Sequence, residues 1–385
     1  MNARSSRKDN SSGGSSSKND DKWDENLHLT PLRTKLCLPP LRSEWITRSR
    51  LVKSLDEGLG HKLILISAPA GFGKTTLLVD WVHTHKIPVA WFSVDKGDNN
   101  PLNFLTYVIL GLQSLEADIG KAALTMLQSP QPPPIEPILI NLINEVSRIS
   151  KDLALVIDDY HLVDAKPIHE LMAFLLENLP EQMHIIIATR SDPPLPLARV
   201  RSQNLLTEIR AADLSFRADE TANFLNQRLN LQLSTRDIQL LETRTEGWIA
   251  GLQLAALSLQ GCEDPSDFIK GFKGDNRYIA DYLTEEVLSR QSEQLRKFLL
   301  QTSILGRLCG PLCDAVTHQQ NSQQMINTIE KANLFVIPLD DERCWYRYHQ
   351  LFADLLAQRL RTQQSDLVPE LHRLGSYSYR TKQAG

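Results

Sequence analysis

The sequence predicts a parallel α/β fold in the first half of the chain, followed by a helical arm and a winged helix. Two observations carry this prediction. Up to about residue 211, short apolar runs alternate with helical segments, and from Ala212 onward the strand signals nearly vanish and helical periodicity takes over. Buried strands that alternate with crossover helices are typical of a doubly wound sheet with helices on both faces.

Two segments precede the alternation. Residues 1–26 are rich in Ser, Asn, Asp, Lys and Gly. They are too polar to fold alone, so we expect a disordered tail. Residues 27–59 hold three prolines and end in RSRLVKSLDEGL, a pattern that predicts an extended lead-in followed by a short amphipathic helix.

Five apolar runs predict the strands of the sheet. They are KLILIS (62–67), VAWFSV (89–94), LALVI (153–157), HIIIAT (184–189) and LLTEI (205–209). We therefore place an α/β domain over residues 27–211 and a helical arm over residues 212–275. Residues 276–365 include a stretch that reads helix, strand, acidic turn, strand, helix, an order that predicts a winged-helix domain.

The composition excludes several classes of protein. With 385 residues, 42% of them hydrophobic, the chain is long enough for two or three domains with sizeable cores. A formal net charge of -4 gives no argument for DNA or an anionic membrane as partner. The five cysteines are scattered and fit neither a disulfide framework nor a paired zinc spacing. The first residues have no apolar core behind their charges, so we expect no signal peptide. No apolar run approaches the roughly 18 residues of a membrane span, so we expect a cytoplasmic protein without a membrane partner.

A glycine-rich turn follows the first apolar run directly. Residues 68–76 read APAGFGKTT and lead into an amphipathic helix, as a phosphate-binding P-loop requires. Gly71 and Gly73 allow backbone amides to surround a phosphate at the positive end of the helix dipole. Lys74 would reach the β- and γ-phosphates of ATP, and Thr75 would ligate Mg²⁺. The nucleotide-binding residues expected in this loop are Ala70, Gly71, Phe72, Gly73, Lys74, Thr75 and Thr76.

The turn departs from the pattern G-x-x-x-x-G-K-[ST] at its first position, which is Ala68. That glycine serves a tight turn, so an alanine there indicates an unstrained backbone and not the loss of the site. Taken without its flanks, the loop also fits a glycine-rich strand-to-helix turn with an incidental lysine.

Two carboxylates end the third apolar run, in LALVIDDY. In a parallel sheet they project from the carboxyl edge, where the phosphate loop also lies. Asp158 would hold the Mg²⁺ shell, and Asp159 would orient or deprotonate the attacking water. Taken alone, a strand that ends in Asp-Asp is more often followed by an ordinary turn. The presence of the phosphate loop earlier in the chain favours the functional interpretation of the two carboxylates. At the end of the fourth run, Arg190 would sense the γ-phosphate and stabilise developing charge; a surface arginine that caps the strand is the alternative.

Beyond these motifs, five spaced segments carry a resemblance: TKLCLPPLRSEWITRSRLVKSL, VAWFSVDKGDNNP, ATRSDPPLPLARVRSQNLLTEIRAADLSF, RTEGWIAGLQLAALSLQG and WYRYHQLFADLLAQRL. With them, the sequence from about Leu32 onward resembles the ATPase portion of MalT-like, LuxR-family transcriptional activators, within the signal-transduction ATPases called STAND. The resemblance implies a nucleotide-binding α/β P-loop NTPase domain, a helical arm and a winged helix. It also implies a state closed over ADP, which an inducer and ATP open into an oligomer.

The resemblance implies contacts for single residues as well. Thr47 and Arg48 would lie against the adenine. His349, in Tyr-His-Gln where related switches carry Met-His-Asp, would touch the β-phosphate of ADP from the winged helix. Gln253 stands where relatives have the proline of a Gly-x-Pro motif. From the residues alone, a histidine at a helix start beside aromatic side chains is more often a packing or capping residue.

Full-length relatives continue into a helical superhelix that binds inducer and a helix-turn-helix that binds DNA. By the resemblance, residues 366–385 form the start of a truncated superhelix, and no DNA-binding domain is expected on this chain. The partners implied are a nucleotide and, in the ATP state, further copies of the chain or full-length relatives.

Three functions fit these features. The first is an ATP/ADP switch with Mg²⁺ and slow ATP hydrolysis, in which the bound nucleotide sets the conformation. The second is a phosphotransferase acting on a small-molecule acceptor, which needs a lid and an acceptor pocket. The third is a truncated nucleotide-binding interaction module. The combination of the nucleotide motifs with a helical arm and a winged helix favours the switch.

Overall fold

The computed structural model describes residues 31–40, 46–260, 262 and 264–383. The tail predicted at residues 1–26 lies outside them. Residues Leu32–Gly385 form one compact unit, to which all the helices and strands named below belong.

A five-stranded sheet forms the centre of the first half of this unit. Its strand order is β2-β3-β4-β1-β5, and every pair of neighbours is parallel. The strands are β1 (Leu63–Ser67), β2 (Val89–Ser93), β3 (Leu153–Asp158), β4 (Met183–Thr189) and β5 (Leu206–Arg210). Each predicted run is therefore a strand, and no end moves by more than one residue. The order places β4 between β1 and β3, so the ends of these three strands meet at one edge.

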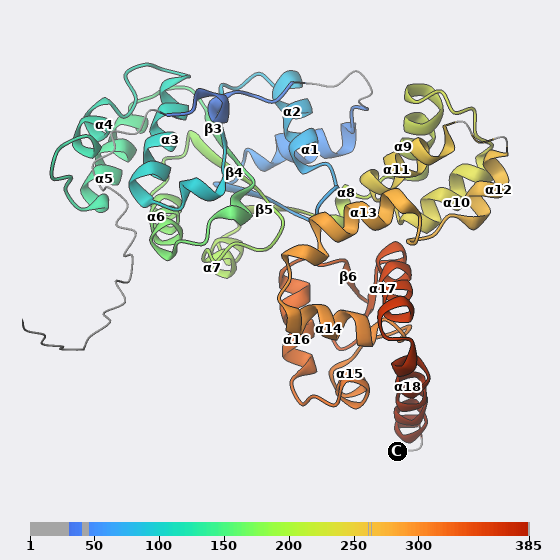
Figure 1. Ribbon diagram of the computed structural model, residues 1–385. Helices are drawn as coiled ribbons and strands as arrows, with labels where there is room; N and C mark the ends of the chain where they lie inside the picture. The colour runs from blue at the N-terminus through green and yellow to red at the C-terminus, as the bar shows by residue number, and fades with distance from the viewer. Residues whose placement is uncertain (1–30, 41–45, 261, 263, 384–385) are drawn as a thin grey trace, which may run out of the picture. The chain divides into compact units, whose positions relative to one another are not determined.

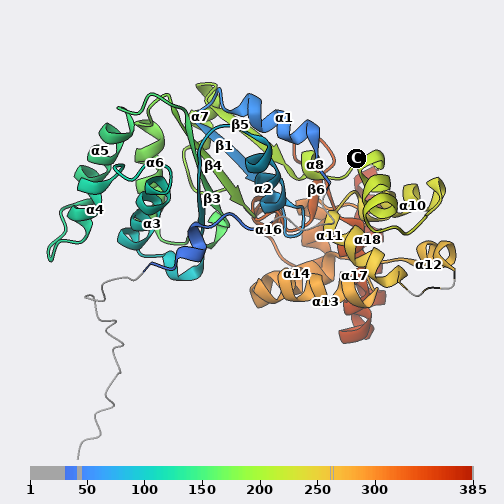
Figure 2. The same cartoon turned by 90° about the horizontal axis from the view of Figure 1, so that it is seen from above.

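Helices cover both faces of the sheet because its strands are apolar on both sides (Figures 1 and 2). On one face, Ile64 and Ile66 pack against α1 (Ser49–Gly58) and α2 (Lys74–Thr84). Leu63 and Leu65 point to the other face, because successive side chains of a strand alternate. The helices on that face are α3 (Pro101–Gln113), α5 (Ile135–Val146) and α6 (Lys166–Glu177).

Short helices build the arm after the last strand. They are α8 (Ala211–Leu214), α9 (Ala218–Ala222), α10 (Thr235–Thr245), α11 (Ile249–Leu259) and α12 (Pro265–Gly271). Gly247 makes the turn from α10 to α11 with a φ of 70°. A Cβ atom at this position would lie 2.5 Å from the carbonyl oxygen of Phe216, so only glycine fits.

The winged-helix region begins with α13 (Arg277–Glu286) and has the predicted order of elements (Figure 1). Its helices are α14 (Glu293–Thr302), α15 (Gly310–Thr317), α16 (Ser322–Lys331) and α17 (Gln350–Gln363). The wing is an antiparallel hairpin of β6 (Val336–Pro338) and β7 (Tyr346–Tyr348). One more helix, α18 (Val368–Gln383), begins shortly after α17. Among the described helices, none combines the length and the apolar character that crossing a bilayer requires.

One hydrophobic core runs through all three parts. The cluster that fills the α1 and α2 side of the sheet continues without a break to Trp248 of the arm and to Phe335 and Phe352 of the winged helix. The phosphate loop contributes Phe72 to the same cluster. The arm and the winged helix are therefore packed against the loop, and not tethered beside it.

Candidate nucleotide-binding site

The phosphate loop leaves the carboxyl end of β1 and ends where α2 begins at Lys74. Gly71 and Gly73 have φ angles of 77° and 76°, in the left-handed region that side chains with a Cβ disfavour, which explains both glycines. Ala68 is not among the described residues with a positive φ. An alanine at the first position of the motif is therefore compatible with the turn, as predicted.

Lys74 folds back on the loop in this structure. Its Nζ donates to the carbonyl oxygens of Ala68, at 2.8 Å, and Pro69, at 2.9 Å. The residue is only 8% exposed. Burial lowers the pKa of Lys74 to about 8, and the charge of Arg190 adds to the effect. Among the described residues, the hydrogen-bond partners of the ammonium group are neutral carbonyl groups, so an anionic phosphate would be a stronger partner.

Thr75 and Asp158 form the candidate metal site. The Thr75 hydroxyl donates to Oδ2 of Asp158 at 2.8 Å. Burial, and then the neighbouring Asp159, raise the pKa of Asp158 to about 6. A hydroxyl and a carboxylate at this distance are the oxygen donors that Mg²⁺ takes beside phosphates and water, so the residues fit the ion. Mg²⁺ bound there would neutralise part of the charge of the phosphates.

The charged side chains at the neighbouring strand ends complete the cluster. Asp159 follows β3 in the left-handed region, with a φ of 57°, and its carboxylate remains 45% exposed. Arg190, directly after β4, donates from Nη1 to Oε2 of Glu286 at 3.0 Å. The topology therefore brings Lys74, Asp158, Asp159 and Arg190 to one edge of the sheet, as the strand ends predicted.

A cavity of about 470 Å³ adjoins the loop, and we call it the loop cavity. Its lining is apolar on the arm side and polar at the start of α2, a combination that suits a purine base next to phosphates. The lining residues are Pro39, Pro40, Ile46, Arg48, Gly71, Gly73, Thr75, Thr76, Leu77, Val79, Asp80, Phe216, Phe224, Ile249, Ala250 and Gln253.

Arg48 lies at the loop cavity, whereas Thr47 does not line it. The guanidinium carbon of Arg48 lies 4.6 Å from the ring centre of Phe216, and its Nη2 pairs with Glu220 at 3.4 Å. Thr47 donates from its hydroxyl to Oδ1 of Asp80 at 3.2 Å, and Asp80 does line the cavity. Thr47 therefore reaches this cavity through Asp80.

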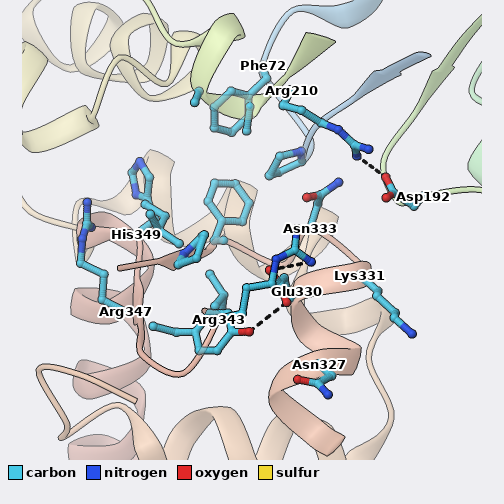
Figure 3. Close-up of a pocket in the computed structure, with 18 of the residues that line it drawn as sticks. Phe72, Asp192, Arg210, Asn327, Glu330, Lys331, Asn333, Arg343, Arg347 and His349 are labelled. Carbon is cyan, nitrogen blue, oxygen red and sulfur yellow. Dashed lines mark hydrogen bonds and ion pairs between the residues drawn. The ribbon is translucent and has the colours of Figure 1, made fainter. Parts of the chain in front are cut away.

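A second cavity, of about 1200 Å³, lies between the sheet edge and the winged helix, and we call it the interdomain cavity (Figure 3). His349 and Phe72 line it instead of the loop cavity. The Nε2 atom of His349 lies 2.9 Å from the carbonyl oxygen of Thr245, and its ring packs edge to face on Trp248 and Phe335. Aromatic rings thus lie beside His349. One of them, Phe335, packs on Phe72 of the phosphate loop.

Four residues at the site carry contacts that the motifs did not predict. Trp248 donates from Nε1 to the carbonyl oxygen of Ala70 at 3.0 Å, Glu286 holds Arg190, and Glu220 holds Arg48. His161 lies 3.7 Å from Asp159. His161 had a signal in the sequence, since it follows the Asp-Asp pair by two residues. The glutamates had none, because their partners are far away along the chain.

The arm and the winged helix are joined by a bidentate ion pair. Arg347 of β7 donates from Nη1 and Nη2 to the two carboxylate oxygens of Glu246, both at 2.8 Å. The side chain of Arg347 is 37% exposed, so water screens the pair. We expect a double-mutant cycle of Arg347→Ala and Glu246→Ala, measured by urea unfolding, to give a coupling free energy of about 1 kcal/mol. The exposed Arg361→Ala serves as control and should show no coupling to Glu246; equal couplings would contradict the prediction.

Comparisons with known proteins agree with this architecture. Residues 284–368 match the MalT winged helix domain. Over 348 residues, 90% of this chain and 38% of the relative, the sequence is 34% identical to the HTH-type transcriptional regulator MalT of Klebsiella pneumoniae. It is also 36% identical to the serine/threonine-protein kinase PknK of Mycobacterium tuberculosis over 334 residues. This matched stretch covers 86% of this chain and 30% of the kinase. The chain therefore spans about a third of the length of these curated relatives.

The fold has a solved counterpart. A Walker-type ATPase of Pyrococcus abyssi superposes with a TM-score of 0.55 at 15% sequence identity, covering 83% of this chain and 98% of the other. At that identity the likeness concerns the fold alone. Together with the matched winged helix and the MalT similarity over nine-tenths of the sequence, it identifies the chain as MalT-like: a P-loop ATPase fold joined to a MalT-type winged helix.

Proposed function

We propose that the chain is an ATP- and ADP-binding switch in a MalT-like, LuxR-family transcriptional regulator of the STAND type. Its nucleotide-binding domain (27–211) binds the nucleotide with Mg²⁺ and hydrolyses ATP slowly. The helical arm (212–275) and the winged helix (276–365) respond to which nucleotide is bound. In the ATP state the chain associates with further copies of itself or with full-length relatives in the cytoplasm.

The observation that carries this proposal is the direct contact of the arm with the phosphate loop. The backbone N–H of Ala250 donates to the carbonyl oxygen of Gly71 at 3.1 Å. The indole of Trp248 donates to Ala70, the residue before Gly71. A Cβ atom on Gly71 would lie 2.6 Å from the Cβ atom of Ala250. A loop that rearranges around phosphates therefore changes its contacts with the arm, and the coupling acts in both directions.

The winged helix also reaches the end of β1. Asn333 donates from Nδ2 to the Ser67 hydroxyl at 3.0 Å, and that hydroxyl donates to Asp192 at 2.9 Å. Asp192 in turn pairs with Arg210 at the end of β5, as Figure 3 shows. These bonds link the turn after α16 to the sheet edge where the nucleotide is proposed to bind.

Arg190 supplies the difference between ATP and ADP in this proposal. Its guanidinium is held by Glu286 at the end of α13, and the same carboxylate accepts from Arg290 at 2.8 Å. A γ-phosphate beside Arg190 would compete with Glu286 for this cation, whereas ADP has no such group. ATP would thus weaken a contact that holds α13 to the sheet, and ADP would leave it in place.

Replacing Glu286 with glutamine tests this coupling. Because the variant removes the charge that competes with the γ-phosphate, we expect the affinity for ATP to rise about tenfold relative to that for ADP. Association in the presence of ATP should then start at a lower nucleotide concentration. Isothermal titration calorimetry and sedimentation velocity measure the two effects. The exposed neighbour Glu285→Gln is the matched control; the same shift in both variants, or in neither, would count against the coupling.

The nucleotide that copurifies with the protein tests the resting state. We expect denaturation of protein purified without added ligand to release ADP in close to one equivalent, because the arm and the winged helix close on the loop. Ion-pairing chromatography identifies and counts the nucleotide. A wild-type protein that carries no nucleotide and binds neither ATP nor ADP in calorimetry would refute the switch.

A further inference from the structure

Tyr282 on α13 lies against the phosphate loop. A Cβ atom on Gly71 would lie 2.9 Å from the hydroxyl oxygen of Tyr282, so this oxygen is next to the backbone of the loop. The ring of Tyr282 is half-buried and packs on the indole of Trp248, with 5.6 Å between the ring centres. Packing therefore places the hydroxyl group beside Gly71, one of the residues whose backbone is proposed to surround the phosphates.

The hydroxyl group of Tyr282 makes no hydrogen bond to the described part of the chain. Tyrosine hydroxyls that leave the solvent usually find a partner. The buried tyrosines among the described residues all have one: Leu32 for Tyr107, His169 for Tyr160, Glu330 for Tyr346 and Thr302 for Tyr348. Tyr282 thus presents a free donor at the phosphate loop, and packing alone does not explain its hydroxyl group.

The neighbours of Tyr282 keep its hydroxyl group protonated. Tyr282, Glu286 and Arg290 follow one another at intervals of four residues, so they share one side of α13 and its continuation. This side faces the sheet edge, because Glu286 binds Arg190 there. Burial raises the pKa of Tyr282, and the carboxylate of Glu286 adds to the effect. The two arginines oppose this shift without reversing it. The hydroxyl group can therefore donate a hydrogen bond at physiological pH.

A phosphate oxygen is the acceptor that suits this donor. The carbonyl oxygens of the loop beside Tyr282 are already in use, since that of Ala70 accepts from Trp248 and that of Gly71 accepts from Ala250. The carboxylate one turn further along α13 already accepts from two arginines. A phosphate held by the backbone amides of the loop would offer a charged acceptor at the same place. Such an acceptor binds a hydroxyl group more strongly than a neutral carbonyl does.

The position of Tyr282 depends on the ion pair between Glu286 and Arg190. Glu286 lies one turn after Tyr282, and its contact with Arg190 at 3.0 Å holds this end of α13 to the sheet. In the proposed function a γ-phosphate weakens that contact, whereas ADP leaves it in place. Tyr282 therefore stays beside the loop when ADP is bound and loses this position when ATP is bound.

We propose that the hydroxyl group of Tyr282 donates a hydrogen bond to the β-phosphate of ADP and thereby makes the site prefer ADP over ATP. The inference rests on the proposed function and deepens it, because it names a residue that distinguishes the two nucleotides by a contact made only in the resting state. Glu286 acts through Tyr282 in this respect: it keeps α13 in place and does not touch the phosphate itself.

Tyr282→Phe tests the contact, because it removes the hydroxyl group and keeps the ring on Trp248. We expect the dissociation constant for ADP to rise about tenfold, as for the loss of a hydrogen bond to a charged acceptor, and that for ATP to change less than about twofold. Isothermal titration calorimetry with Mg²⁺ measures both. The matched control is Tyr278→Phe, which removes the hydroxyl group of a tyrosine that is 48% exposed one turn earlier on α13 and should change neither constant.

A second readout does not depend on affinity. Phosphorus-31 NMR of saturating ADP should show a different β-phosphorus resonance in Tyr282→Phe and in the wild type, whereas the α-phosphorus resonance stays in place. Equal losses of ADP and ATP affinity, an unchanged ADP affinity, or the same β-phosphorus resonance in both proteins would overturn the inference. Wild-type protein that binds ADP but fails these tests contradicts the role of Tyr282 alone, whereas protein that binds no nucleotide contradicts the proposed function as well.

Discussion

Replacing Lys74 with alanine is expected to lower the affinity for both ATP and ADP about 100-fold, which corresponds to about 2.7 kcal/mol. In the described part of the chain, the ammonium group bonds to two carbonyl oxygens of its own loop. Bound phosphates would replace these neutral acceptors with charged ones, and alanine removes that gain without touching the glycines that shape the loop. Isothermal titration calorimetry at pH 7 gives both constants. Lys53→Ala, an exposed lysine on α1, should bind as the wild type does.

The pH dependence of binding gives a second measure of the same side chain. Burial and Arg190 lower the pKa of Lys74 to about 8. Phosphate binding favours the protonated form, so affinity should be flat with respect to Lys74 below pH 8 and should fall as the pH rises above 8, by at most about tenfold per pH unit. Lys74→Ala should lose this decline. A wild-type affinity that rises between pH 8 and 10 would contradict the assignment.

Most of the fold could be predicted from the sequence because the strands are buried on both faces. Such strands form continuous apolar runs such as HIIIAT, and their ends are clear where polar residues follow. The winged helix was predictable from the order of its elements. The order of the strands was less accessible. The position of β4 between β1 and β3 depends on which strands pair with each other. The sequence of a single apolar run does not show which strand will lie next to it.

The position of the candidate site residues was predictable where they are close in sequence to a strand end. Asp158 is the last residue of β3, and the phosphate loop, Asp159 and Arg190 directly follow buried strands. Parallel strands present their carboxyl ends together. Contacts between distant segments were not predictable in this way. Trp248 reads as one residue of an apolar helical stripe, and only the folded chain shows its Nε1 on the carbonyl group of Ala70, 178 residues away.

Trp248→Ala is therefore expected to have the largest effect on stability, about 3–5 kcal/mol in the free energy of unfolding. The indole is fully buried, and its ring lies 5.2 Å from that of Phe335 and 5.6 Å from that of Tyr282. Its loss leaves a cavity where the loop, the arm and the winged helix meet. Denaturation with guanidinium chloride, followed by far-ultraviolet circular dichroism, measures the change. Phe298→Ala, at a fully buried position on α14, should cost a similar amount.

The rate of ADP release distinguishes the Trp248→Ala variant from the Phe298→Ala variant. Among the described residues, no hydrogen bond or ring contact joins Phe298 to the loop, so its variant should release ADP at close to the wild-type rate. Trp248→Ala frees the loop from the arm and should release ADP faster. Trp248→Phe separates the two contributions of the indole, because it keeps a ring but removes the donor to Ala70. If that hydrogen bond holds the loop in its resting shape, Trp248→Phe should lose only about 1 kcal/mol of stability and still release ADP faster than the wild type. Wild-type release from this variant would mean that ring packing alone connects the arm to the loop, and that the arm responds to the nucleotide through Phe335 and Phe72 instead.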